Sequence, residues 1–130
     1  MRRVTPAAEI NEQTLGAQVR AFYGRARLDP ELGPVFEGAV EDWEAHFDLL
    51  TRFWMSVAMG VRVYDGRPMQ AHMRQPIRPE MFDRWLELWG EIADGLFEPE
   101  PAALLKSKAA TIGRGMRLGL FFRPETPQAS

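Results

Sequence analysis

Apolar side chains recur at three- and four-residue spacing in four long segments of this chain, and proline or glycine stands at the breaks between them. This spacing is typical of amphipathic α-helices, in which about 3.6 residues complete one turn and one face is buried. Residues 60–68 contain turn residues and no run long enough to pair as a β-strand. The sequence therefore predicts an all-α protein.

The first predicted helix covers residues 12–27 and directs Tyr23 toward the core. It ends before Asp29-Pro30, because the residue that precedes a proline is disfavoured in helical backbone. Residues 32–36 then leave room for a turn or two at most. The apolar face of this first helix consists of Leu15, Val19, Phe22, Tyr23 and Ala26.

Asp42 is a suitable N-cap for the next helix, which covers residues 43–59 and stops at Gly60. His46 lies on the apolar face of this helix. The same face carries Trp43, Leu50, Phe53 and Val57.

Two further long helices are expected in the second half of the chain. Pro79 fits the first position of a helix that ends near Leu96, with Glu80 in its first turn. Its apolar stripe consists of Phe82, Trp85, Leu86, Trp89, Ile92, Ala93 and Leu96. The last helix is expected to open at Pro101, with Leu105, Ala109, Ile112 and Met116 on its buried face. A short helix around His72 should precede these two.

The size and composition of the chain are those of one globular domain. It has 130 residues, of which 45% are hydrophobic and 26% are charged, so it can bury one core with a modest cavity. We expect residues 1–10 to be an N-terminal extension, residues 11–122 to form the folded domain, and residues 123–130 to be a frayed tail.

Charge and cysteine content exclude several kinds of partner and cofactor. The net charge is −2 and the arginines are spread along the chain, which argues against nucleic acid as a partner. No apolar run approaches the ~20 residues of a membrane span, and no signal-peptide core follows the first arginines, so we expect a cytoplasmic protein without membrane contact. The absence of cysteine excludes disulfides, iron–sulfur centres and thiolate ligands. Any metal would be held by nitrogen or oxygen.

The chain has two histidines, and neither has an ordinary surface setting. His46 shares a helix face with aromatic residues, and His72 lies between turn residues and two prolines. Taken singly, His46 could be a core residue with one hydrogen bond, and His72 could be an exposed loop residue. Taken together, two imidazoles that face an aromatic interior are what a buried iron porphyrin requires. The sequence leaves open whether His46 points into the pocket or out of it.

Tyr23 and Trp85 form a second pair of candidate functional residues. Both carry a polar N–H or O–H group on a predicted inward-facing position, where it needs a partner. Backbone carbonyls would suffice for either residue alone. If a haem is present, the same two groups can donate hydrogen bonds to dioxygen, whose outer atom carries partial negative charge when it is bound. Phosphate-binding loops, nucleophile elbows and zinc-protease motifs are all absent from the sequence.

Several segments, taken in order over about residues 10 to 120, resemble the truncated haemoglobins of group III. These segments are Phe22-Tyr23, residues 28–36 (LDPELGPVF), residues 43–46 (WEAH), Phe53-Trp54, residues 64–72 (YDGRPMQAH) and residues 82–86 (FDRWL). The resemblance implies a globin-like, two-over-two helical sandwich around haem b. It also implies that His72 is the proximal iron ligand and that Tyr23, His46 and Trp85 line the distal side.

Further cofactor contacts are expected from residues of the same segments. The resemblance implies that Phe36 packs on the haem. The arginines near His72, namely Arg67, Arg74 and Arg78, are candidates for the two propionates, because guanidinium groups suit carboxylates. The full set of expected cofactor contacts is Phe36, Phe53, Trp54, Met69, Met73, Arg74, Arg78 and Phe82.

The resemblance implies reversible binding of dioxygen and other diatomic ligands, with nitric oxide or peroxide redox chemistry as a further activity. Nitric oxide dioxygenase activity would need an external reductase, and peroxidase-like activity an external reductant, because the chain has no flavin or nicotinamide motif. Two alternatives remain from the residues alone. One is a cofactor-free helical interaction domain in which Tyr23, His46 and Trp85 are core polar groups. The other is a carrier of a small apolar ligand, which would not require His72.

Overall fold

The computed structural model describes residues 5–64, 75 and 77–121. The described part of the chain forms five α-helices and no strand beyond one isolated β-bridge, so the all-α prediction is confirmed. The helices are α1 (Glu12–Ala26), α2 (Gly33–Ala39), α3 (Trp43–Met59), α5 (Glu80–Leu96) and α6 (Pro99–Phe121). None of these helices has an apolar stretch long enough to cross a membrane.

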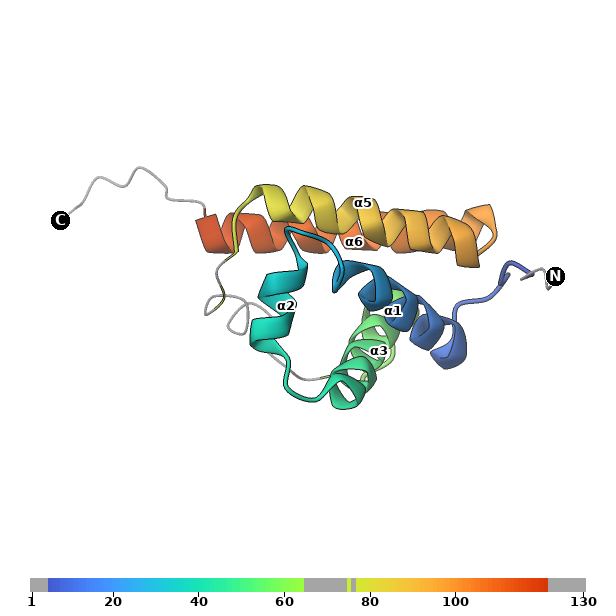
Figure 1. The fold of residues 1–130 in the computed structure, drawn as a ribbon. Helices are drawn as coiled ribbons and strands as arrows, with labels where there is room; N and C mark the ends of the chain where they lie inside the picture. Colours follow the sequence, from blue (N-terminus) through green and yellow to red (C-terminus); the bar gives the residue numbers. More distant parts are fainter. Residues whose placement is uncertain (1–4, 65–74, 76, 122–130) are drawn as a thin grey trace.

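The four long helices form two layers (Figure 1). α5 and α6 run antiparallel and pack on each other in one layer, while α1 and α3 pack together in the other. Contacts of α1 with α5 and of α3 with α6 join the layers. This is the expected two-over-two sandwich, with the short helix α2 placed beyond the C-terminal end of α1.

Local capping explains where α1 begins and where α3 begins and ends. The Asn11 side chain accepts from the backbone N–H of Thr14 at 2.9 Å, and the Asn11 N–H donates to the Thr14 hydroxyl, which closes a capping box at α1. Asp42 caps α3 by accepting from the N–H of Ala45 at 3.1 Å, and Gly60 ends α3 with a φ of 73°. The predicted roles of Asp42 and Gly60 are confirmed, whereas Asn11 had been overlooked.

The predicted start of the last helix was wrong by two residues. α6 begins at Pro99 and includes Pro101 in its first turn. Both prolines are tolerated because the first N–H groups of a helix have no partner within it. α2 also extends beyond the expected Phe36 to Ala39, and α5 begins one residue after Pro79.

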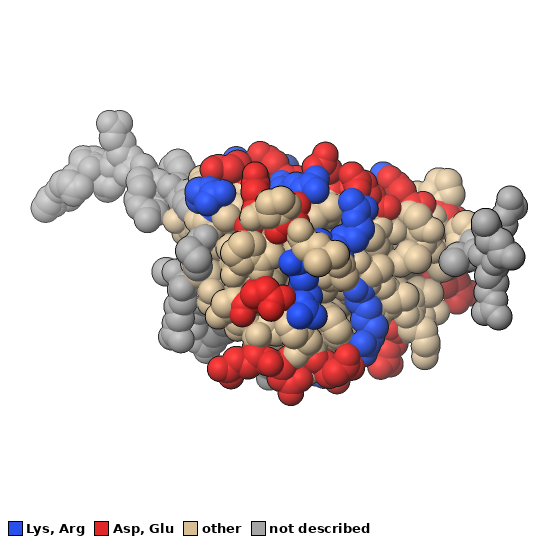
Figure 2. Space-filling model, viewed as in Figure 1, with Lys and Arg blue, Asp and Glu red and all other residues tan. Residues whose placement is uncertain are grey.

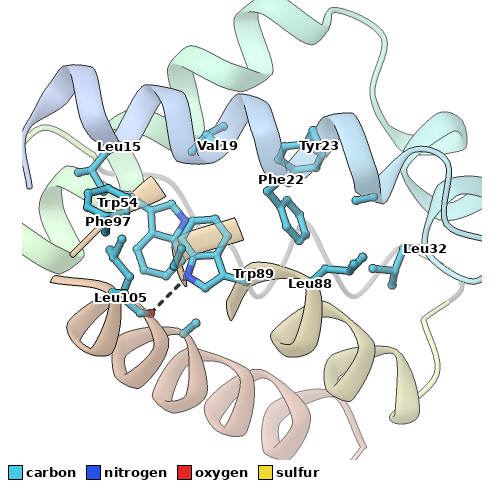
Figure 3. Packing of buried hydrophobic residues seen from close by; sticks show 14 of the residues in the cluster. Leu15, Val19, Phe22, Tyr23, Leu32, Trp54, Leu88, Trp89, Phe97 and Leu105 are labelled. Atoms are coloured by element: carbon cyan, nitrogen blue, oxygen red, sulfur yellow. Dashed lines mark hydrogen bonds between the residues drawn. The ribbon is translucent and has the colours of Figure 1, made fainter. Parts of the chain in front are cut away.

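The core lies where the two layers meet (Figure 3). Trp89 of α5 stacks on Trp54 of α3, with ring centroids 4.3 Å apart and planes 19° from parallel. Phe22 of α1 packs edge-on against Trp89 at 5.6 Å. The Trp89 indole donates to the backbone carbonyl of Leu105 at 3.3 Å, so this buried N–H is satisfied within the α5–α6 layer.

The described residues that precede α1 contact the turn between α5 and α6. The N–H of Ala7 donates to the carbonyl of Leu96 at 2.8 Å, and the N–H of Glu98 donates to the carbonyl of Ala7 at 2.9 Å. Ala7 and Ile10 also pack against the core. Residues 5–10 are therefore joined to the far end of the α5–α6 layer.

Candidate functional site

A cavity of about 390 Å³ lies among the five helices. Its volume is in the range of small-molecule and cofactor sites, which are concave and mostly apolar with a few polar groups. Its walls include Val19, Leu32, Val35, Leu50, Met81, Ile112 and Met116 as well as several aromatic rings. The side chains on its lining that carry a polar group are those of Tyr23, His46, Trp54, Tyr64, Gln75, Trp85 and Trp89.

Most of the site residues expected from the sequence meet at this cavity. Tyr23, Phe36, His46, Phe53, Trp54, Phe82 and Trp85 all line it. Arg78 does not, because its side chain is exposed and its Nε lies 3.2 Å from Glu80 Oε1. Arg67, Met69, His72, Met73 and Arg74 lie outside the described residues.

Tyr23 and His46 face each other at the cavity wall. The Tyr23 hydroxyl oxygen lies 3.4 Å from His46 Nε2, and the two rings meet nearly edge to face with centroids 5.3 Å apart. Which of the two groups donates depends on the histidine tautomer. Burial raises the pKa of Tyr23, so its hydroxyl keeps its proton at neutral pH and remains a donor. His46 is among the residues that line the pocket.

The cavity explains why the apolar face of α3 is less buried than its pattern suggests. Trp54 is the buried residue of this helix, whereas Leu50 and Phe53 are half-buried and Leu49 is 38% exposed. These side chains line an apolar space instead of packing on a neighbouring helix. These apolar side chains of α3 therefore keep solvent-accessible surface that a ligand in the cavity can cover.

Trp85 lies one turn before Trp89 on α5 and is half-buried. Its benzene edge points to α6, since a Cβ on Gly113 would lie 3.5 Å from Trp85 Cζ3. Nε1 is at the opposite edge of the indole. Unlike Trp89, Trp85 has no hydrogen-bond acceptor for this N–H among the described residues. The indole can therefore donate to a molecule held in the cavity.

Sequence reasoning missed some parts of the site. Ile112 and Met116 of α6 were expected only as packing residues, yet they form a cavity wall. Trp43 was assigned no role, although its ring centroid lies 5.4 Å from that of Tyr23 and 5.8 Å from that of His46. Trp43 lies three residues before His46, and residues three apart share a helix face. This spacing could have predicted that Trp43 contacts His46.

The lining of this cavity fits a flat, apolar cofactor that binds a small polar ligand. Aromatic rings and aliphatic side chains form most of the wall, which suits a porphyrin plane. Several side chains able to donate a hydrogen bond, among them those of Tyr23, His46 and Trp85, line the same space. The described residues are therefore compatible with haem.

Comparison with solved structures agrees with this architecture. The fold is similar to the crystal structure of group III truncated hemoglobin from Campylobacter jejuni, with a TM-score of 0.85 and 25% sequence identity over 94% of this chain and 100% of that chain. The fold and the cavity thus define a helical globin of the truncated, two-over-two kind.

Sequence comparison identifies the group. The group 3 truncated hemoglobin ctb of Campylobacter jejuni is 30% identical over 108 residues, which are 79% of this chain and 85% of that protein. No protein-family model matches the chain. The chain belongs to the group 3 truncated haemoglobins, as its sequence resemblance implied. Membership of this family implies haem binding in general.

Proposed function

We propose that this protein holds haem b in the cavity and reversibly binds dioxygen and other diatomic ligands there. The observation that supports this most strongly is the convergence of Tyr23, His46 and Trp85 on one apolar cavity in a chain of this family. When bound, haem would supply the iron that takes a diatomic ligand. His72 is the proposed proximal ligand, since it is the other imidazole of the chain and lies in the segment that resembles the family.

The side chains of the cavity would bind the cofactor and orient the ligand. Phe36, Phe53 and Phe82 provide apolar surface against a porphyrin and exclude water. Hydrogen bonds to a charged or strongly polarised oxygen contribute about 1.5–3 kcal/mol each. Tyr23, which keeps its proton, and Trp85, whose N–H has no other described acceptor, are the proposed donors to dioxygen.

His46 would act on Tyr23. The tyrosine hydroxyl has one proton, so when it donates into the cavity its oxygen can accept from the Nε2–H tautomer of His46 at 3.4 Å. Hydrogen bonds in such a chain polarise and strengthen one another. We therefore expect His46 to orient the Tyr23 hydroxyl toward the ligand, in addition to controlling access to the pocket.

Redox chemistry on nitric oxide or peroxide is a second candidate function. Its support is His46, which places an imidazole within the cavity, where it could move a proton during cleavage of an O–O bond. Either reaction would require an external electron donor, which for nitric oxide dioxygenation is a reductase, and we propose the cytoplasm as the compartment in which the protein meets it.

Arg78 remains a proposed partner of a haem propionate. It follows Ile77, which lines the cavity, and its exposed side chain is paired with Glu80 alone among the described residues. Arg74, Met69 and Met73 are proposed contacts that lie outside the described residues. Loss of a propionate contact in Arg78→Ala should increase the haem dissociation rate.

Purification and spectroscopy test the proposed function. We expect a red protein with a Soret band, oxygen release that can be followed by stopped flow on the reduced protein, and reaction of the oxygenated protein with nitric oxide if it is a dioxygenase. A colourless protein of full helicity that does not bind added haem would contradict the proposal. Binding of an apolar dye to such a protein would then favour the apolar-ligand carrier, and no dye binding would favour the interaction domain.

A further inference from the structure

Arg20 of α1 and Arg27, the C-cap residue that directly follows α1, lie on either side of Tyr23 and reach across to the beginning of α3. Arg20 precedes Tyr23 by about one turn, and Arg27 follows it by about one turn. Both side chains are exposed. Figure 2 shows basic side chains across the middle of one face of the molecule, with acidic ones along its upper and lower edges. The part of α3 that they reach carries His46.

Arg20 contacts α3 in two ways. Its two terminal nitrogens lie 3.0 and 2.9 Å from the two carboxylate oxygens of Glu44, which is the bidentate geometry that favours a guanidinium over an ammonium. Its guanidinium carbon also lies 4.9 Å from the centroid of the Phe47 ring. Arg20 therefore contacts residues on both sides of His46 in the α3 sequence.

Arg27 makes the corresponding contacts at the other end of Tyr23. Its guanidinium carbon lies 4.1 Å from the centroid of the Trp43 ring, within the range of a cation–π interaction. Its Nε lies 2.8 Å from Glu37 of α2. Arg27 thus links the end of α1 to α2 and to the first residue of α3.

The two aromatic rings held by these arginines also contact the Tyr23–His46 pair. Trp43 meets Tyr23 at 5.4 Å and His46 at 5.8 Å between ring centroids. Phe47 meets Tyr23 at 6.0 Å. Each ring therefore stands between an arginine on the surface and the hydrogen-bonding pair at the cavity wall.

We propose that Arg20 and Arg27 are positioning residues that hold Phe47 and Trp43 in place and thereby set the Tyr23–His46 separation from outside the cavity. The role in ligand binding rests on the proposed function. The 3.4 Å separation is at the long end for a hydrogen bond, so a small displacement of the first turns of α3 changes it appreciably. Surface ion pairs contribute little alone, but here the same arginines hold Trp43, whose ring contacts both partners, and Phe47, whose ring contacts Tyr23.

The test compares Arg20→Gln, Arg27→Gln and the double variant with the matched control Arg25→Gln. Arg25 is also on α1 and is similarly exposed, with its guanidinium 2.9 Å from Glu91 on α5, but it has no aromatic partner on α3. Because the chain has two histidines, the His46 ring signals can be assigned by NMR as those that are absent from His46→Leu. Protein that carries haem is studied in a diamagnetic, carbon monoxide-treated form.

We expect Arg20→Gln and Arg27→Gln to shift the ring signals of His46 and Tyr23, and the double variant to shift them further. Arg27→Lys, which keeps a cation near Trp43, should return the signals part of the way. Arg25→Gln should leave them unchanged. His46 and Tyr23 signals that do not move in the double variant, or that move equally in Arg25→Gln, would overturn the proposal.

Oxygen release provides a second readout that a purely structural role would not reproduce. A change of about 0.5–1 kcal/mol for each arginine corresponds to about a two- to fivefold change in the release rate. This change should disappear when His46 is already replaced by leucine, because the arginines act through the histidine. An equal change in the His46→Leu background would overturn the proposal. Failure to bind haem would contradict the proposed function, while the NMR comparison would still decide the role of the arginines.

Discussion

The carboxylate of Asp29, in the turn between α1 and α2, accepts a hydrogen bond from Nε of Arg84 on α5 at 2.7 Å. The same carboxylate accepts the backbone N–H groups of Glu31 and Leu32, each at 3.0 Å. Its side chain is 3% exposed. This ion pair, in which the Asp29 carboxylate is buried, fixes the corner of the chain from which Phe36 reaches the cavity, so the position of α2 depends on it.

Replacing Asp29 by asparagine should reduce the free energy of unfolding by about 1–3 kcal/mol, the cost of losing hydrogen bonds to a charged group. We expect a value in the lower half of this range, because the Arg84 side chain is 35% exposed and solvent weakens the pair. Urea unfolding at neutral pH measures the change. The exposed pair of Asp83 with Arg117 is the control, and Asp83→Asn should cost less than about 1 kcal/mol.

The contribution of Asp29 should also depend on pH. Burial alone would raise the pKa of Asp29, but the hydrogen bonds from Arg84 and from the N–H groups of Leu32 and Glu31 outweigh burial and lower it. The folded protein then binds this proton less readily than the unfolded chain, so the pair stabilises the fold above about pH 4. The stability difference between wild type and Asp29→Asn should shrink as the pH falls through the lowered pKa. A difference that stays constant from pH 7 to pH 3 would show that the pair is not ionised.

Gly33→Ala should destabilise the protein by about 1–3 kcal/mol, the usual cost of forcing an extra group into a packed site. A Cβ on Gly33 would lie 2.5 Å from the backbone carbonyl oxygen of Arg27, which cannot move away easily. Gly38 is in the same helix and has no atom within 4 Å of such a Cβ. Gly38→Ala should therefore stabilise the protein by roughly 0.5–1 kcal/mol, as helix propensity predicts. The urea unfolding midpoints of the two variants, each compared with that of the wild type, measure these effects. A Gly33→Ala variant as stable as Gly38→Ala would refute the close contact between residue 33 and the Arg27 carbonyl.

His72→Ala should lose haem or bind it weakly, whereas His46→Ala should retain it. His72 is the proposed iron ligand, and His46 lies beside Tyr23 at the cavity wall. Haem content after purification and the spectrum of the reduced protein test this directly. A normal five-coordinate ferrous spectrum in His72→Ala would mean that the axial ligand is another residue.

Tyr23→Phe and Trp85→Phe should each accelerate oxygen release by roughly ten- to a hundredfold. Each removes a donor worth about 1.5–3 kcal/mol, which corresponds to this factor if the barrier follows the hydrogen bond. The double variant should depart from additivity, because both donors address one ligand. Stopped-flow release from the reduced, oxygenated protein gives these rates.

His46→Leu is the companion variant for these two. We expect it to alter mainly the association rate, with a smaller effect on release through the loss of its contact with Tyr23. If oxygen release proved insensitive to Tyr23→Phe and Trp85→Phe but rose strongly in His46→Leu, His46 would be the principal donor and our distal assignment would be wrong.

Much of the fold was predictable because helical spacing and capping residues act between residues close in the sequence. Helical spacing placed α1, α3 and α5 within about two residues of their observed bounds, and Asp42 and Gly60 marked the ends of α3 through their own backbone chemistry. The first turn of α6 was misjudged because two prolines, Pro99 and Pro101, are both allowed there. The inward direction of Tyr23 also followed from its place in the apolar pattern, and it is buried in the structure.

The arrangement of the site was decided by tertiary structure. The spacing of residues along each helix indicates which side chains share a face. The distance between Tyr23 and His46, however, depends on how α1 crosses α3. Trp85 and Trp89, one turn apart on α5, both line the cavity, but Trp89 stacks on Trp54 and its N–H donates to a backbone carbonyl. The sequence by itself determined most of the helices, because capping and periodicity act between near neighbours, and the resemblance of its ordered segments indicated the family. Only the packing of helices distant in the chain decided which of the inward-facing polar groups are satisfied in the core and which remain available to a ligand.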